Sequence, residues 1–319
     1  MINTVLIAGA GAVGLTVAES FYKYDRKCVS ILAKGERLRR YREEGLWVNG
    51  RRLDFSLADA GTDGTFRPGG EVSFPDLVVV ACKSHHLPEV IGDLEPFIGK
   101  NTVILSLLNG IKSEEQIGAV FGRDKLPLAM MLGADSQRKG SRVCFTRRGV
   151  VHFGGAEGME TGRDRDIAGF FTRAALPFEY HPADMKKTLW FKFMVNVGVN
   201  QTSALLRLPY GAFKRKSPHT IREAGEILES AMREVIAVAA AEGICLEEKD
   251  IDRWLDSADS LSDNGYTSMA QDVLAGRKTE VEIFGLTVME YGKKYGIPTP
   301  VNETLYRALR AVEQTKNVL

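Results

Sequence analysis

The chain has 319 residues, of which 44 % are hydrophobic and 26 % are charged, as in an ordinary globular protein of about two domains. Its 42 Lys and Arg residues balance 41 Asp and Glu residues, and this net charge of +1 argues against a dedicated nucleic-acid-binding protein. The cysteines form no CxxC pair and have no histidine at ligand spacing, so the pattern is neither a disulfide scaffold nor a zinc module. They are Cys28, Cys82, Cys144 and Cys245.

The apolar runs are shorter than the ~20 residues that a membrane-spanning helix requires. Two of the longest are Thr4–Leu15 and Leu77–Cys82. The start of the chain has no basic segment before its first apolar run, so we expect no secretion signal. These features predict a soluble, cytoplasmic protein with no membrane partner.

In the first half of the chain, short β-branched runs alternate with helical stretches. The expected strands and helices, in chain order, are Thr4–Ala8, Gly14 to about Lys23, Cys28–Ala33, Gly35–Glu44, Leu77–Cys82 and Val103–Leu105. The last two are fully apolar, as are strands buried on both faces of a parallel sheet. A hairpin-like insert, Gly45–Leu57, has a turn at Asn49-Gly50. This alternation predicts an open α/β sheet.

The second half of the chain is predicted to be mostly helical. Val150–Phe153 is the last segment expected to form a strand, and apolar residues then recur at helical spacing in Ile221–Ala241, Glu280–Tyr295 and Glu303–Val318. Pro177 and Pro182 mark a boundary near residue 180. We therefore expect a Rossmann-type parallel-sheet domain over residues 1–180 and an all-α domain over residues 181–319.

A glycine loop follows the first expected strand and opens a helix. It consists of Gly9, Ala10, Gly11, Ala12, Val13 and Gly14. In a dinucleotide-binding fingerprint, the first glycine permits a tight turn and the second lets the backbone approach the pyrophosphate. The third allows the helix to pack on the strand, and the helix N-terminus attracts the phosphate charge. The alternative is a purely structural turn, but the surrounding strand–helix–strand pattern favours nucleotide binding.

The end of the second expected strand predicts which nicotinamide cofactor binds. NAD-binding domains usually place an acidic residue there to bond the ribose hydroxyls. This chain instead has Lys34 at the strand tip, with Arg37 nearby, where a 2′-phosphate would be met by positive charge. A solvated basic turn is the alternative. The pattern favours NADP(H) over NAD(H).

The chain resembles the ketopantoate reductases (2-dehydropantoate 2-reductases), within the wider group of 6-phosphogluconate-dehydrogenase-like reductases. The resemblance runs nearly end to end and depends on the order and spacing of several segments. These are residues 9–14, 34–38, 81–83, Asn109-Gly110, 149–154, 190–200, 267–272, Thr279-Glu280 and 296–302.

The resemblance implies that hydride passes from NADPH to a 2-keto acid while Lys192 protonates the ketone oxygen. The residue pattern agrees, because Lys192, Asn196 and Asn200 are four residues apart and share one face of a helix that is otherwise mostly apolar. Burying one ammonium and two amides without hydrogen-bond partners costs roughly several kcal/mol. We therefore expect these three side chains to face a solvent-filled cleft. The alternative is a snorkelling lysine with internally bonded asparagines.

Further site residues follow from the resemblance. It implies that Ser268 contacts the substrate, and that Glu280 lies near the cofactor and helps to position Lys192; the alternatives are a helix cap and a surface carboxylate. It also implies that Asn109 contacts cofactor and substrate and that Lys83 lies near the cofactor; the alternative for both is a loop residue ending a strand. We interpret His85 and His86 as loop or helix-start histidines and expect no metal site.

Three positions depart from the family pattern. Leu108 occupies a position where glutamine is common, and Gly265 and Tyr210 occupy positions where asparagine is expected. Losing a buried hydrogen-bond partner costs ~1–3 kcal/mol in recognition. We therefore keep three hypotheses: an NADPH-dependent ketopantoate reductase in pantothenate and coenzyme A biosynthesis, a related reductase of another 2-keto acid, and a non-catalytic NADP(H)-binding sensor. A monomer or a homodimer is expected in each case.

Overall fold

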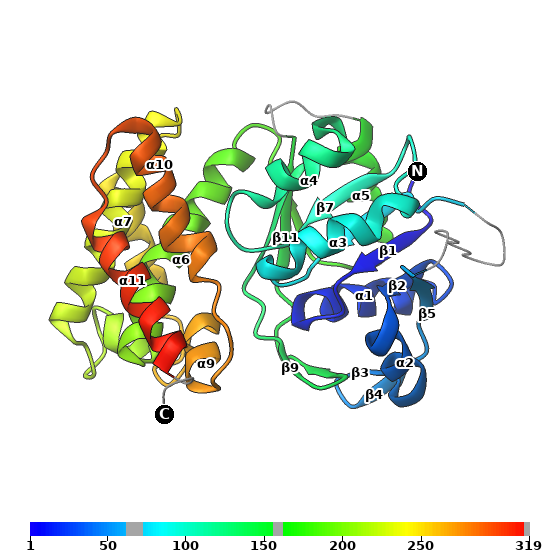
Figure 1. Ribbon diagram of the computed structural model, residues 1–319, viewed down its shortest axis with the longest axis horizontal. Coiled ribbons are helices and arrows are strands. Elements are labelled where there is room, and N and C mark those ends of the chain that lie inside the picture. Colours follow the sequence, from blue (N-terminus) through cyan, green and yellow to red (C-terminus); the bar gives the residue numbers. More distant parts are fainter. Residues whose placement is uncertain (62–72, 156–161, 316–319) are drawn as a thin grey trace. The chain divides into compact units, whose positions relative to one another are not determined.

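The computed structural model describes residues 1–61, 73–155 and 162–315. The chain divides into two compact units, Met1–Lys186 and Lys187–Leu319 (Figure 1). The division comes shortly after the boundary predicted near residue 180, within the first turn of helix α6 (Met185–Leu206). The end of the helix predicted over Glu303–Val318 lies outside the described residues.

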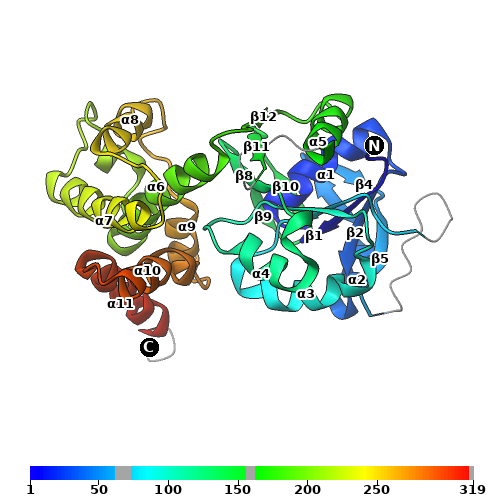
Figure 2. The same cartoon turned by 90° about the horizontal axis from the view of Figure 1, so that it is seen from above.

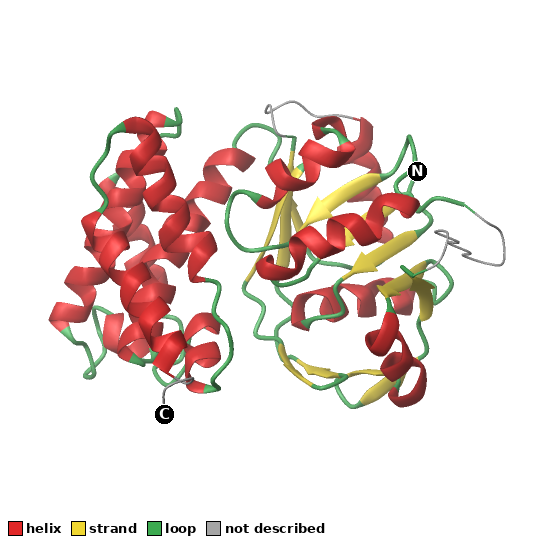
Figure 3. Ribbon diagram, viewed as in Figure 1, coloured by secondary structure: helices red, strands yellow, loops and turns green. Residues whose placement is uncertain are grey.

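Five parallel strands form the main sheet of the first unit, in the order β5-β2-β1-β6-β7. Strands are yellow and helices red in Figure 3. This sheet and the helical second unit confirm the predicted fold class. The strands are β1 (Val5–Ala8), β2 (Val29–Ala33), β5 (Ser56–Asp59), β6 (Leu77–Val80) and β7 (Val103–Ser106). The prediction is wrong for Ser56 and Leu57, which belong to the main sheet beside β2 rather than to a hairpin.

Helices cover both faces of this sheet. Alternate residues of its apolar strands point to opposite sides, so each face packs its own hydrophobic core. Val5 and Ile7 of β1 belong to one core cluster with Phe21, whereas Leu6 belongs to a second cluster with Leu94. Burying one such side chain contributes roughly 1.5–3 kcal/mol. The helices of these layers are α1 (Ala12–Tyr24), α2 (Gly35–Glu44), α3 (Leu87–Leu94) and α4 (Ser113–Phe121). Single 3₁₀ turns occur at Ser84–His86, Glu95–Phe97 and Arg123–Lys125.

Two smaller sheets complete the first unit. One has the order β4-β3-β10-β9, and the predicted turn at Asn49-Gly50 joins its strands β3 and β4. The other has the order β12-β11-β8, and helix α5 (Gly162–Arg173) contributes Phe170 and Phe171 to the same core as Phe153. The strand bounds are β3 (Leu46–Val48), β4 (Arg51–Leu53), β8 (Leu128–Leu132), β9 (Gln137–Lys139), β10 (Arg142–Cys144), β11 (Val150–Gly154) and β12 (Phe178–Tyr180).

Strand β12 corrects the expectation that Val150–Phe153 is the last strand. Its three residues are too few for a clear alternating pattern, and tertiary contacts decide its conformation. The rings of Phe178 and Tyr180 pack against Phe153 of β11, with ring centroids 5.9 and 5.4 Å apart. β12 pairs in parallel with β11.

The second unit is built of helices (Figure 2). They are α6, α7 (Arg222–Ala241), α8 (Glu248–Ala258), α9 (Ser268–Leu274), α10 (Thr287–Tyr295) and α11 (Pro300–Thr315), with a 3₁₀ turn at Tyr210–Phe213. The segment predicted as one helix over Glu280–Tyr295 instead begins with a π-helical turn, Glu282–Leu286. Among the helices of the described residues, none is long and apolar enough to cross a lipid bilayer.

A buried amide network ties three of these helices together. The side-chain amide of Asn302 donates to Oε2 of Glu234 at 2.7 Å and to the carbonyl of Ala231 at 3.1 Å, both on α7. Its Oδ1 accepts a bond of 2.9 Å from Gln201 of α6. Because buried polar groups are costly when unpaired, these bonds fix the register of α11 against α6 and α7.

Candidate functional site

The glycine loop joins β1 to α1 in the first unit, and two of its glycines are required by the backbone. Gly9 has a φ of +115°, and a Cβ there would lie 2.6 Å from the backbone N of Cys82. A Cβ on Gly14 would lie 2.0 Å from the carbonyl O of Gly9. Larger side chains are therefore excluded, and β1, the loop and α1 come within backbone contact.

The N-terminus of α1 is suited to an anion. Gly11 is its N-cap residue and has no side chain to bond the first N–H groups, and the first turn has no acidic residue. Unbonded N–H groups and the helix dipole attract phosphate at such an end. Ala10 is buried, whereas Gly11, Ala12 and Val13 are half-buried.

The predicted cofactor residues of the first unit follow the carboxyl ends of four strands of one parallel sheet. The glycine loop follows β1, Lys34 follows β2, Lys83 follows β6 and Asn109 follows β7. Lys83 is exposed and Asn109 is half-buried. Open parallel sheets bind their ligands at this edge, so the fold brings these residues to the edge where a dinucleotide would bind.

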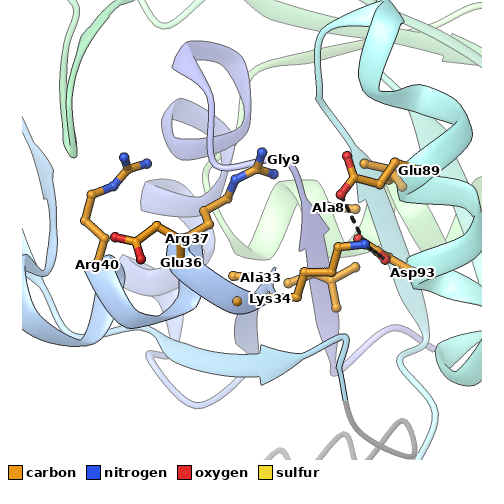
Figure 4. Close-up of a pocket in the computed structure, with 12 residues that line it drawn as sticks. Ala8, Gly9, Ala33, Lys34, Glu36, Arg37, Arg40, Glu89 and Asp93 are labelled. Carbon is orange, nitrogen blue, oxygen red and sulfur yellow. Dashed lines mark hydrogen bonds and ion pairs between the residues drawn. The ribbon is translucent and has the colours of Figure 1, made fainter.

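A pocket of about 440 Å³ lies at the ends of β1 and β2 (Figure 4). Its walls come from the glycine loop, the start of α2 and the exposed side of α3. The lining residues are Ala8, Gly9, Leu32, Ala33, Lys34, Gly35, Glu36, Arg37, Arg40, Glu89, Val90 and Asp93.

Lys34 forms ion pairs with two carboxylates in this pocket. Its Nζ lies 2.7 Å from Oδ1 of Asp93 and 3.1 Å from Oε1 of Glu89, both on α3. The hydrogen bond to Asp93, and then that to Glu89, raises the pKa of Lys34, and Lys34 in turn lowers the pKa of Glu89. A phosphate that binds Lys34 therefore has to share the ammonium with two carboxylates, which the sequence did not reveal because α3 is distant in the chain.

Two arginines add positive charge to the same pocket. Arg37 and Arg40 are three residues apart on α2 and both line the pocket (Figure 4). The Nε of Arg40 is buried without a hydrogen-bond partner among the described residues. An orphaned donor of this kind fits an anionic ligand. Arg40 was missed as a site residue, although its spacing from Arg37 places both on one helix face.

A buried network supports the loop that carries Asn109. The hydroxyls of Ser106 and Ser113 lie 2.7 Å apart, and Ser113 donates to Oε2 of Glu114 at 2.8 Å. Burial raises the pKa of the Glu114 carboxyl. The side chain of Leu108 is buried in the core beneath this loop, so it packs rather than offering a polar group in the way a glutamine would.

In the second unit, the predicted polar stripe lies on helix α6. Lys192 and Asn196 are half-buried, and Asn200 is buried with 6 % of its surface exposed. Their spacing of four residues places them on one helix face, as expected. Burial deepens along the stripe from Lys192 towards Asn200.

Ser268 is not a helix cap, and Glu280 is not a surface carboxylate. Ser268 is exposed at the start of α9, but the helix cap is Thr267, whose Oγ1 accepts a bond of 3.1 Å from the N–H of Ala270. Glu280 is buried with 5 % exposure, so it is not a surface carboxylate. It directly precedes Val281 and the π-helical turn, a feature frequent at functional sites.

Tyr210 and Gly265, the other two positions that depart from the family pattern, are in contact with each other. The N–H of Tyr210 donates to the carbonyl of Gly265 at 2.8 Å. A Cβ on Gly265 would lie 3.2 Å from Cδ2 of the Tyr210 ring. The absence of a side chain at Gly265 thus makes room for this ring, and the two substitutions form one local arrangement.

Comparison with known families matches both halves of the chain. The family described as "Ketopantoate reductase PanE/ApbA" matches residues 5–158, and "Ketopantoate reductase PanE/ApbA C terminal" matches residues 184–313. A 2-dehydropantoate 2-reductase of Aquifex aeolicus is 27 % identical over 327 aligned positions, covering 98 % of each chain.

Solved structures share the fold. A PanE/ApbA family ketopantoate reductase from Ralstonia eutropha is 24 % identical with a TM-score of 0.82, covering 98 % of this chain and 99 % of the other. D-mandelate dehydrogenase, solved with NADH and anilino(oxo)acetate, is 21 % identical with a TM-score of 0.85 and the same coverage. At these identities the likeness extends to the fold alone.

Proposed function

The chain belongs to the ketopantoate reductase family, and we propose that it catalyses the NADPH-dependent reduction of 2-dehydropantoate to (R)-pantoate, a step of pantothenate and coenzyme A biosynthesis. The proposal rests on one observation above all. Lys192 lies half-buried at the start of a polar stripe on a helix that is otherwise largely apolar.

The first unit has residues that fit a dinucleotide phosphate. We assign its pyrophosphate to the loop Gly9–Gly14 and the N-terminus of α1, because the backbone there is open to an anion. We assign the 2′-phosphate of NADP(H) to the pocket of Lys34, Arg37 and Arg40, with Lys83 nearby on the same sheet edge. When bound, NADPH would supply the hydride that reduces the ketone carbon.

We propose that residues of the second unit donate the proton and bind the substrate. Negative charge grows on the ketone oxygen during reduction, and the Lys192 ammonium both stabilises this charge and donates the proton. Asn196, Asn200 and Ser268 are proposed to bind the keto acid through hydrogen bonds. Glu280 is proposed to help position Lys192.

Asn109 of the first unit is proposed to contact both cofactor and substrate, because it stands at the carboxyl end of β7 on the edge that carries the glycine loop. We propose that the enzyme acts as a monomer or a homodimer.

The direct test follows NADPH oxidation with ketopantoate and a panel of other branched 2-keto acids. A kcat/KM for ketopantoate in the range of ~10⁴–10⁸ M⁻¹s⁻¹, well above that of each analogue, is the expected result. Tight NADPH binding with no oxidation by any substrate would contradict the proposal and indicate a non-catalytic NADP(H)-binding sensor.

A second candidate is a reductase of another 2-keto acid with the same catalytic residues. The contact between Tyr210 and Gly265 favours it, because an aromatic ring and a bare backbone replace two amides expected to bond polar substrate groups. In the same panel, this candidate predicts negligible reduction of ketopantoate and efficient reduction of a different keto acid.

A further inference from the structure

We propose that His152, Glu179 and His181 form a binding site for a divalent transition-metal ion such as Zn²⁺, on the small sheet β12-β11-β8 of the first unit. His152 of β11 is the direct partner of Glu179 in the parallel β11–β12 ladder. His181 follows two residues after Glu179 and continues the ladder through its N–H bond of 2.8 Å to Phe153. Paired residues and residues two apart share one face, so all three side chains emerge together.

The three donor atoms have the spacing of a metal site. Nδ1 of His152 lies 2.9 Å from Nε2 of His181 and 3.5 Å from Oε2 of Glu179, and the last two atoms are 3.7 Å apart. A tetrahedral Zn²⁺ with bonds of about 2.0–2.2 Å has ligand atoms about 3.3–3.6 Å from one another. The three distances of this triangle therefore differ from those of a tetrahedral site by only a few tenths of an ångström, and a turn of the two hydrogen-bonded imidazoles would aim both nitrogens at the ion.

The ligand types suit the same ion. Two imidazole nitrogens and one carboxylate, with a fourth position left to water, form a known zinc ligand set, whereas Mg²⁺ and Ca²⁺ prefer sites made of oxygen atoms. The ion would replace the hydrogen bond between the His152 and His181 rings. His152 would then bind the ion through Nδ1 and carry its proton on Nε2.

A further carboxylate lies beside one of the imidazoles. Oδ1 of Asp184 lies 3.5 Å from Nδ1 of His181, the ring nitrogen that does not face the other ligands. A carboxylate at this position favours the tautomer with a proton on Nδ1 and leaves the Nε2 lone pair for the metal. This arrangement supports the assignment independently of the triangle itself.

The two histidines of the site are mostly buried, whereas its glutamate is exposed, so an ion could reach the site from solvent. The side chains of His152 and His181 are 10 % and 21 % exposed, whereas Glu179 is 60 % exposed. On the other face of the strands, Phe153 packs against Phe178 and Tyr180 and fixes both strands in place. An ion entering from the Glu179 side would join β12 to β11.

The test uses the full-length, tag-free chain treated with EDTA and then titrated calorimetrically with Zn²⁺, with Mg²⁺ as the ion expected not to bind. We expect one Zn²⁺ per chain and visible absorption bands when Co²⁺ replaces it. Glu179→Gln and His181→Asn should each weaken Zn²⁺ binding at least about tenfold, and Asp184→Asn should have a smaller effect. Glu115→Gln, an exposed carboxylate of the same unit, is the matched control.

Thermal unfolding provides a second readout, because an ion that binds only the folded state raises the Tm. Zn²⁺ should raise the Tm of the wild type and of Glu115→Gln more than that of Glu179→Gln, whose exposed side chain is not needed for folding. The proposal is overturned if no stoichiometric Zn²⁺ binding occurs, or if Glu179→Gln binds Zn²⁺ as tightly as the wild type.

Discussion

Tyr210 and Gly265 are in direct contact: the N–H of Tyr210 donates to the carbonyl of Gly265 at 2.8 Å, and the missing side chain of Gly265 leaves room for the Tyr210 ring. Both positions depart from the pattern of the ketopantoate reductase family. A side chain at Gly265 would press on the ring at 3.2 Å, so these two departures depend on each other.

We therefore expect Tyr210→Asn and Gly265→Asn to be strongly non-additive. Gly265→Asn alone should reduce the Tm and kcat/KM because its Cβ meets both the Tyr210 ring and the backbone O of Ser262 at 3.2 Å. In the double variant, Tyr210→Asn should relieve the part of that loss that comes from the ring. A coupling free energy of about 0.5–3 kcal/mol is expected for residues in contact. The double-mutant cycle is measured with ketopantoate and by thermal unfolding, and additive effects would refute the dependence.

The pairing of Lys34 with Asp93 and Glu89 leads to a prediction on cofactor choice. Glu89→Gln combined with Asp93→Asn removes two negative charges beside the proposed 2′-phosphate site and leaves Lys34 to the phosphate. The ratio of kcat/KM for NADPH over NADH should rise, by about tenfold. Lys34→Asp should lower this ratio.

The matched control for cofactor choice is Glu95→Gln, an exposed carboxylate that follows α3 outside the pocket lining. Its NADPH-to-NADH ratio should equal that of the wild type. A ratio that stays constant in Lys34→Asp as well as in the double variant would exclude a 2′-phosphate role for Lys34.

Glu114 makes stability depend on pH. Burial raises the pKa of its carboxyl, so the folded state holds this proton more tightly than the unfolded state does. The free energy of unfolding should therefore fall as pH rises above the ordinary carboxyl pKa near 4.5. Glu114→Gln removes this dependence and should gain stability relative to the wild type between pH 5 and pH 8. Urea unfolding at several pH values tests this, and equal slopes for both proteins would contradict it.

The four cysteines should differ in reactivity. Burial raises the pKa of Cys28 to about 12, so its thiol stays protonated at neutral pH. Cys144 and Cys245 are exposed. A disulfide reagent at pH 8 should label these two promptly and label Cys28 only after unfolding. Prompt labelling of Cys28 in the folded protein would contradict this prediction.

The glycine loop and the parallel sheet could be predicted because their signals are local. Strands β1 and β6 are entirely apolar, and β2 and β7 each contain a single serine. The backbone contacts of Gly9 and Gly14 leave glycine as the only residue that fits. Helix α2 begins and ends at the predicted residues for the same reason.

The features that could not be predicted depend on contacts between segments distant in the sequence. Lys34 meets Asp93 across 59 residues, and His152 meets His181 across 29, so no short motif announces either pair. β12 follows from aromatic packing on Phe153, and the π-helical turn after Glu280 interrupts a pattern that is regular in sequence. The roles of Lys192, Asn196, Asn200, Ser268, Glu280, Asn109 and Lys83 stay predictions.

The most direct test of the central claim compares Lys192→Ala with the wild type in ketopantoate reduction and in NADPH affinity. Lys187→Ala, an exposed lysine on the same helix, is the matched control. We predict that Lys192→Ala lowers kcat by about 10²–10⁴-fold, as expected for loss of a general acid, while the Kd for NADPH stays within about threefold of the wild type. Unchanged turnover, or loss of NADPH binding together with turnover, would contradict the assignment of Lys192 as the proton donor.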